Sequence, residues 1–173
     1  MMGVWHSEAL PIASRYMVIG RRAKPTEEFA AKYGFQRWSV ALNEALADPR
    51  IDTVIVANPS ELHAETALRC LEAGKPTLVE IPIAMSYTDA ARVVDAAERL
   101  GLPLGVVHPM RFRRERAELR ERLAAGKEHV RHIHGRFFIH RLVNIGATGY
   151  HRSWIDNLLW HHTTFELRTK LAQ

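Results

Sequence analysis

Short runs of apolar and β-branched residues alternate with helical stretches along most of the chain, and this alternation limits the fold more than any other feature. Residues 53–57, Thr-Val-Ile-Val-Ala, are the most regular of these runs. Strands that alternate with helices predict βαβ units and a parallel sheet. We therefore expect an α/β fold with a Rossmann-like, doubly wound parallel sheet. The expected strands are residues 16–20, 35–40, 53–57, 77–80 and 104–107.

The intervening stretches have helical spacing and are bounded by residues that begin or end helices. Ser60 is expected to cap the helix that follows it, and Gly74 and Gly101 are expected to end the helices before them. The expected helices are residues 6–14, 26–33, 42–47, 61–73, a helix that begins at Ser86 or Thr88 and runs to 100, and 113–125.

The pattern changes after residue 112. Residues 130–143 alternate polar and apolar side chains, as a strand does when one face of an antiparallel sheet is solvated. We predict an incomplete Rossmann domain over residues 1–112. Residues 113–173 are then the start of an α+β domain with an antiparallel sheet.

The beginning of the chain departs from the usual order of a doubly wound sheet, which is a strand, a glycine-rich turn and then a helix. Here the helix comes first, and Gly3 stands where such a turn would end. We expect the opening strand and the first glycines to be absent. The strands at 16–20 and 53–57 would then lose a shared neighbour and expose unpaired backbone.

Composition excludes several classes of protein. The 173 residues are 47% hydrophobic and 25% charged, which is ordinary for a globular protein. The single cysteine, Cys70, excludes an internal disulfide. No apolar run is long enough to span a bilayer and no signal peptide opens the chain, so we expect a cytoplasmic protein without a membrane partner.

The net charge of +5 raises the question of nucleic acid, but the arginines of residues 111–122 alternate with glutamates. This pattern is typical of a solvated helix face, so no nucleic-acid partner is expected. His132 and His134 share one face of an expected strand, but no acidic or thiol ligand completes a set, and we expect no metal.

Polar residues follow several expected strands at their carboxyl ends, where ligands bind in such sheets. Gly20-Arg21-Arg22 follows the first strand, and arginine at this point accommodates the 2′-phosphate of NADP. The later strand ends carry Asn58, Pro59 and His63, then Glu80, then His108 and Arg111.

These residues resemble a known family. Ala57-Asn58-Pro59 with His63, Glu80-Ile81-Pro82, and His108 with Arg111-Phe112 are similar to the Gfo/Idh/MocA family of nicotinamide-dependent oxidoreductases. The resemblance implies NADP or NAD as cofactor. It implies a nicotinamide pocket lined by Asn58, Pro59, His63, Glu80 and His108. Gly3 would remain from the phosphate turn, and Arg21 and Arg22 would hold the NADP phosphate. Most members have lysine where this chain has Ile81.

A narrower resemblance joins Glu80-Ile81-Pro82 with residues 152–162. Together they look like the 4-carboxy-2-hydroxymuconate-6-semialdehyde dehydrogenases of aromatic-acid breakdown, which also lack the lysine. That likeness implies oxidation of a cyclic hemiacetal, with His161 or His162 as the base. Arg111 and Arg152 would bind substrate carboxylates. The full-length parent is expected to be a homo-oligomer.

A second interpretation stays open. The missing strand, the missing glycines and the unfinished second domain are also what a non-catalytic fragment would show. Near the carboxyl end, Phe165 stands where the resembling enzymes have a further histidine. Such a chain would no longer bind the cofactor productively.

Overall fold

The structure is a computed structural model and describes residues 2–132. The chain divides into two compact units, Met1–Val106 and Val107–Gln173, which we describe separately. The predicted domain boundary lies six residues further along, after residue 112.

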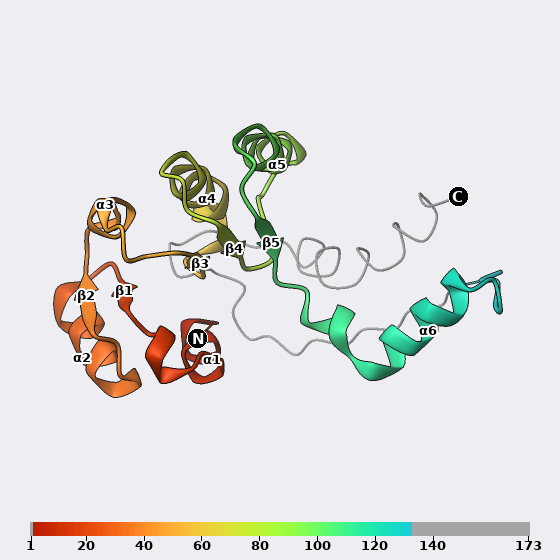
Figure 1. Cartoon of the computed structure of the whole chain (residues 1–173), viewed down its shortest axis with the longest axis horizontal. Coiled ribbons are helices and arrows are strands. Elements are labelled where there is room, and N and C mark those ends of the chain that lie inside the picture. The colour runs from red at the N-terminus through yellow and green to blue at the C-terminus, as the bar shows by residue number, and fades with distance from the viewer. Residues whose placement is uncertain (1, 133–173) are drawn as a thin grey trace, which may run out of the picture. The chain divides into compact units, whose positions relative to one another are not determined.

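The first unit contains five short strands, and each hydrogen-bonded pair among them is parallel. In Figure 1 they follow one another across the picture as β2, β1, β3, β4 and β5, with α1 and α2 on one side and α3, α4 and α5 on the other. This arrangement confirms the expected doubly wound α/β fold. The strands are β1 (Met17–Ile19), β2 (Arg37–Ser39), β3 (Val54–Val56), β4 (Thr77–Val79) and β5 (Leu104–Val106).

The strands of the described residues form two sheets, β1–β2 and β3–β4–β5, with no ladder between β1 and β3. In the first sheet Met17 pairs with Arg37, and in the second Val54 pairs with Thr77. The expected unpaired edges at β1 and β3 are confirmed. All three residues of β1 are only partly buried, whereas Val79 in central β4 is fully buried.

The helices begin and end close to the expected residues, with two corrections. The stretch predicted as one helix over 6–14 is α1 followed by a separate 3₁₀ turn, because Pro11 cannot continue a helix. Ser60 does not cap a helix; it lies buried in the 3₁₀ turn η2 (Ser60–Leu62), and α4 starts at His63. The helices are α1 (Met2–Ala9), α2 (Ala23–Tyr33), α3 (Leu42–Ala47), α4 (His63–Glu72) and α5 (Tyr87–Leu100), and the first 3₁₀ turn is η1 (Ile12–Ser14).

The main core lies between α4, α5 and the β3–β4–β5 sheet. α4 and α5 run side by side over the strands (Figure 1) and pack their apolar faces together. Ser86 fixes the start of α5, because its hydroxyl accepts a hydrogen bond from the Asp89 amide at 3.0 Å. The fully buried members of this core include Ala67, Cys70, Leu71, Val79 and Val93.

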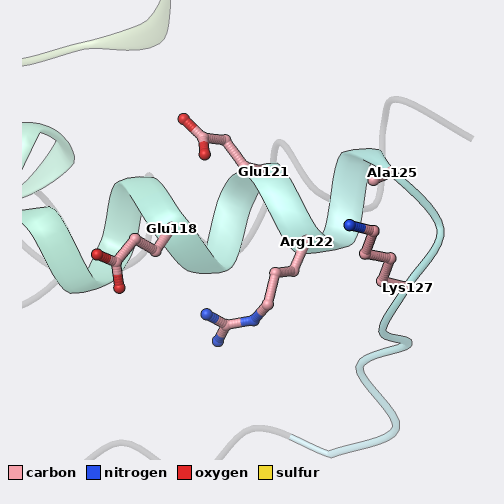
Figure 2. A pocket seen from close by; sticks show the side chains of 5 residues that line it. All are labelled: Glu118, Glu121, Arg122, Ala125 and Lys127. Carbon is pink, nitrogen blue, oxygen red and sulfur yellow. The ribbon is translucent and has the colours of Figure 1, made fainter.

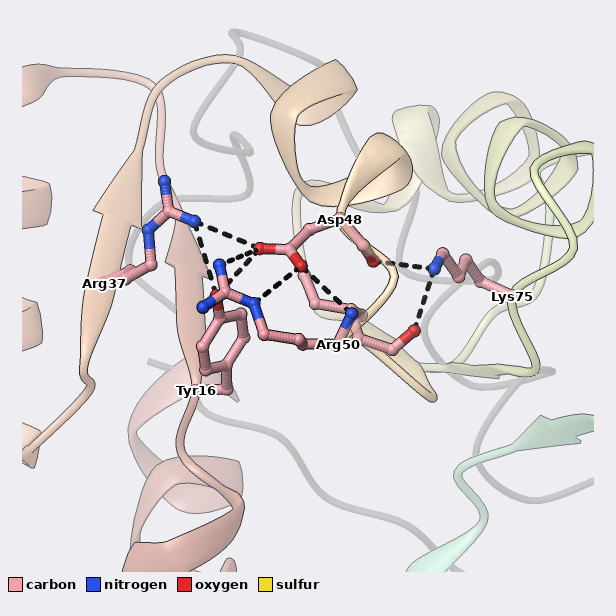
Figure 3. Close-up of polar contacts among 6 residues, drawn as sticks. Tyr16, Arg37, Asp48, Arg50 and Lys75 are labelled. Atoms are coloured by element: carbon pink, nitrogen blue, oxygen red, sulfur yellow. Dashed lines mark hydrogen bonds and ion pairs between the residues drawn. The ribbon is translucent and has the colours of Figure 1, made fainter.

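A cluster of polar side chains around Asp48 joins the two sheets at the end where their strands begin (Figure 3). The carboxylate accepts hydrogen bonds from Tyr16 Oη at 2.8 Å, Arg37 Nη1 at 3.0 Å and Arg50 Nη2 at 2.9 Å. Lys75, just before β4, donates to the carbonyl oxygens of Asp48 and Ile51, both at 2.9 Å. The cluster therefore connects segments that no strand pairing connects.

The second unit is described as far as residue 132. It contains the 3₁₀ turn η3 (Pro109–Phe112) and α6 (Arg114–Ala124), in which no residue is buried. The exposed, arginine- and glutamate-rich helix confirms the predicted solvated face. The strand predicted over 130–143 lies mostly outside the described residues, and 130–132 are not in a strand. No helix in residues 2–132 has the length and apolar character needed to cross a membrane.

Replacing Leu71 by alanine should lower the free energy of unfolding by about 2–5 kcal/mol, because it empties a fully buried site in α4. Urea unfolding followed by circular dichroism measures this. Val94→Ala is the matched control, since Val94 on α5 is 40% exposed and its loss should cost about 0.5 kcal/mol or less. Equal costs for the two variants would contradict the described core.

Acid should weaken the fold through Asp48. Hydrogen bonds from Arg50, and then from Tyr16, hold the pKa of the Asp48 carboxyl well below its usual range. A carboxyl whose folded pKa lies below its unfolded value, about 3.9, stabilises the fold above that value. The contribution is lost as the pH falls below about 4.

Asp48→Asn should therefore flatten the change in urea midpoint between pH 6 and pH 2. Asp95→Asn, an exposed change on α5, should leave the pH dependence as in the wild type. An unchanged slope in Asp48→Asn would show that the Asp48 cluster does not carry the acid sensitivity.

Candidate functional site

The carboxyl ends of β3 and β4 come together at one edge of the sheet, because these two strands are parallel neighbours in register. Asn58 and Pro59 follow β3, and Glu80 follows β4 with its amide bonded to the Val56 carbonyl at 2.9 Å. The structure thus brings together two of the predicted strand ends at the kind of edge where ligands bind in α/β sheets.

His63 links these two strand ends. It is the first residue of α4, its side chain is 1% exposed, and Nδ1 lies 2.6 Å from the Pro82 carbonyl oxygen. Nε2 lies 2.8 Å from the carbonyl oxygen of Asn58. Both ring nitrogens are therefore engaged with backbone, and neither is turned toward an open edge.

Asn58 is held a second time by α4. Its side-chain amide donates to the Thr66 hydroxyl at 2.8 Å, while its own carbonyl faces His63. Asn58 is nevertheless exposed, so its position is fixed without being covered. A fixed and accessible polar residue at a strand end suits contact with a bound ligand.

Glu80 is 4% exposed and contacts a residue that sequence reasoning missed. Its Oε1 lies 2.6 Å from Nε2 of His6, which comes from α1. His6 stands three positions after Gly3, but no spacing in the sequence connects it with a residue 74 positions away. The pair ties the helix after the predicted phosphate turn to the end of β4.

Glu61 was also missed. Both of its carboxylate oxygens are buried and have no hydrogen-bond partner among the described residues. A buried carboxylate without a donor is costly, so Glu61 is unusual among the described residues. Glu61 follows Pro59 and Ser60 at the end of β3, in the same segment as Asn58.

The end of β1 carries Gly20, Arg21 and Arg22. A side chain at Gly20 would overlap Thr26, whose Oγ1 donates to the Arg22 carbonyl and whose Cγ2 would lie 2.9 Å from an added Cβ. Both arginines are exposed, and their guanidinium groups make no hydrogen bond or ion pair within residues 2–132. Two accessible cations at this strand end fit a phosphate-bearing ribose.

Gly3 lies in the first turn of α1, where an added Cβ would come to 3.8 Å from Phe29 of α2. The remaining predicted residues belong to the second unit. His108 stands at the start of η3, and Arg111 is exposed with its carbonyl accepting from Arg120 at 3.2 Å. Arg152, His161 and His162 lie outside the described residues.

Cys70 has no role in chemistry at this site. It is fully buried in α4, and burial raises the pKa of its thiol to about 11, although Arg69 opposes the shift. At neutral pH the thiol stays protonated and is a poor nucleophile. Within residues 2–132 no group of three histidine, cysteine or acidic side chains is placed to hold a metal.

The second unit has a shallow hollow beside the end of α6 (Figure 2). Arg122, which lines the hollow, forms an ion pair with Glu128 at 2.6 Å. All but one of its lining residues are charged, and none of them was predicted for the site. The lining residues are Glu118, Glu121, Arg122, Ala125 and Lys127.

The residues present fit a nicotinamide dinucleotide. Exposed arginines follow β1, and fixed polar groups follow β3 and β4, as a ligand lying along the strand ends requires. Asn58 and Glu80 follow β3 and β4, and the exposed Arg21 and Arg22 follow β1.

Comparison with known proteins identifies the class. Residues 9–108 match the oxidoreductase family with an NAD-binding Rossmann fold, and residues 115–169 match the C-terminal region of bacterial oxidoreductases. The chain therefore belongs to the Gfo/Idh/MocA oxidoreductase family, whose cofactor is NAD or NADP, as the sequence predicted.

Two curated relatives show which enzymes the chain is similar to. The chain is 39% identical over 145 residues to 4-carboxy-2-hydroxymuconate-6-semialdehyde dehydrogenase of Sphingobium sp., covering 84% of this chain and 46% of that enzyme. It is 27% identical to scyllo-inositol 2-dehydrogenase (NAD(+)) of Bacillus subtilis, covering 73% of this chain and 38% of that enzyme. The chain thus spans less than half the length of these relatives.

Among solved structures, levoglucosan dehydrogenase in complex with NADH superimposes with a TM-score of 0.68 at 25% identity. The match covers 73% of this chain and 37% of that chain. It agrees with the parallel-sheet fold described above.

Gly20→Ala should lower the free energy of unfolding by about 1–3 kcal/mol, because the new methyl group has no space beside Thr26. The double variant Gly20→Ala/Thr26→Ala should cost less than the sum of its two single variants, since removing the threonine groups relieves the overlap. Urea unfolding of all four proteins gives this coupling. Strict additivity would contradict the close approach.

Proposed function

We propose that this chain carries the dinucleotide half of a dehydrogenase that oxidises a cyclic hemiacetal from aromatic-acid degradation. The observation that carries the proposal is the 39% identity to the semialdehyde dehydrogenase over 84% of the chain. Ile81 supports it, because it stands where most of the family has a lysine and cannot exchange a proton. A different base is then needed.

The proposed chemistry divides the work between two regions. NADP, when bound, supplies the acceptor for the hydride. His161 or His162 takes the proton of the hemiacetal hydroxyl, for which histidine is suited near neutral pH. Arg111 and Arg152 bind substrate carboxylates, which guanidinium groups grip through two parallel hydrogen bonds.

The residues at the end of β1 favour NADP over NAD as the cofactor. Arg21 and Arg22 are exposed there, and no acidic residue follows this strand directly to bind a free ribose 2′-hydroxyl. Asn58, Pro59, Glu80 and His108 would border the nicotinamide, and Gly3 the pyrophosphate. His63 acts on this pocket through Asn58 and Pro82.

The proposal extends to location and partners. The substrate is a small carboxylated hemiacetal or aldehyde, the location is cytoplasmic, and the full-length enzyme is a homo-oligomer. Neither nucleic acid nor a membrane enters the proposed function.

NADPH binding by the purified chain is the first test, followed by fluorescence enhancement of the nicotinamide. A dissociation constant in the micromolar range supports the proposal, and reduction of NADP with carboxylated cyclic hemiacetals would then establish the substrate class. No binding up to millimolar NADPH would overturn it.

A specific observation supports the second candidate, a non-catalytic chain. β1 and β3 do not pair, so the sheet that holds the dinucleotide is divided where the cofactor would cross it. A version of the chain extended by an amino-terminal strand and glycine turn separates the two candidates. If only the extended version binds NADPH, the 173-residue chain is non-catalytic.

Arg21→Ala/Arg22→Ala should weaken NADPH binding by about ten- to a hundredfold and leave NADH binding within about twofold, because only NADPH carries the 2′-phosphate. Fluorescence titration with both nucleotides measures the ratio. Arg99→Ala, an exposed change on α5 that removes one positive charge, is the control for a loss of surface charge away from this strand end. Equal weakening of NADPH and NADH binding would show that the two arginines do not recognise the 2′-phosphate.

A further inference from the structure

We propose that His63 is a positioning residue that fixes the two strand-end segments of the dinucleotide site by donating hydrogen bonds from both ring nitrogens. The inference rests on the proposed function for its consequence, namely cofactor binding. Its structural part, the two-donor ring, can be tested without any cofactor.

The contacts of the ring carry the argument. Nδ1 lies 2.6 Å from the Pro82 carbonyl oxygen, and Nε2 lies 2.8 Å from the carbonyl oxygen of Asn58. Carbonyl oxygens only accept, and a neutral imidazole has one N–H group. Both contacts can be hydrogen bonds only when the ring carries two N–H groups. With a single N–H, two lone pairs would face each other at one of these distances.

Burial makes the requirement strict. The His63 side chain is 1% exposed, so water cannot replace either partner. Two carboxylates stand in the segments that the ring joins, and neither is among the ring's hydrogen-bond partners in the described residues. Glu61 stands two residues before His63, with both oxygens buried and without a hydrogen-bond partner in the described part of the chain. Glu80 stands two residues before Pro82 and pairs with His6.

The two partners of the ring belong to different strand ends. Asn58 follows β3 and Pro82 follows β4, and the two carbonyls lie 24 positions apart in the sequence. α4 thereby holds both segments from a single residue, and Thr66 on the same helix holds the Asn58 amide. Ordering these segments before the cofactor arrives lowers the entropy cost of binding.

A merely structural histidine would fill the core without controlling these segments. It would need one N–H group and would affect overall stability alone. The two-donor ring makes a different prediction for the protonation of the free chain and for the local exchange of two short segments.

The first measurement uses the wild-type chain labelled with ¹⁵N-histidine at pH 7. NMR should show N–H groups on both nitrogens of His63, with exchange slow enough to detect because the ring is buried. A ring with only one N–H group would overturn the proposal. This measurement does not depend on any variant folding.

The second measurement compares hydrogen exchange in His63→Gln with the wild type. A glutamine side chain has one amide nitrogen and an oxygen that only accepts, so it cannot donate from the positions of both ring nitrogens. Exchange should rise by about tenfold in peptides that cover residues 58–62 and 80–86. Cys70→Ala is the matched control, since it weakens the same helix in the core and away from both segments.

The outcomes are separable. If His63→Gln loosens the two segments and Cys70→Ala does not, the positioning role is supported. If both variants change exchange alike over the whole first unit, the role is structural and the proposal fails. NADPH titration of the same proteins should show about tenfold weaker binding for His63→Gln. Failure of the wild type to bind NADPH counts against the proposed function and leaves the ring and exchange results to decide on His63.

Discussion

The buried carboxylate of Asp48 is the contact on which the first unit most depends. β1–β2 and β3–β4–β5 share no ladder, so the backbone hydrogen bonds that normally join a parallel sheet are absent at this point. Tyr16, Arg37 and Arg50 converge on the carboxylate, which is 7% exposed, and Lys75 holds the backbone of the same loop. Side-chain contacts therefore join the two sheets, at the edge opposite the candidate site.

The order of elements was readable from the sequence because each strand is a short apolar run between turn residues. The pattern of residues 53–57 and the glycine at 101 place β3 and the end of α5 almost to the residue. The two errors in the predicted helix bounds arose at residue types that occur both at helix ends and in other turns. Ser60 has a typical capping side chain but lies inside a 3₁₀ turn, and Pro11 divides a stretch whose spacing looks helical on both sides.

The candidate site was partly predictable for the same reason. Asn58 and Glu80 follow strands, and the parallel register brings strand ends together whatever the loops do. The contacts of His6 with Glu80, and of His63 with Pro82, span 74 and 19 positions, and they depend on how α1 and α4 pack. No local pattern encodes such a distance. Sequence reasoning therefore named His63 and its place in the first turn of α4, but it did not foresee the contacts of the ring with Asn58 and Pro82, and it left His6 out.

Cys70 gives the molecule a built-in reporter. It is the single thiol of the chain, it lies in the core shared by α4, α5 and the larger sheet, and in the closed state it is both inaccessible and protonated. A thiol reagent can reach it only when that core opens. The labelling rate of the unmodified protein then reports how often the region that supports the strand ends opens, and a ligand that binds only the closed form should slow it.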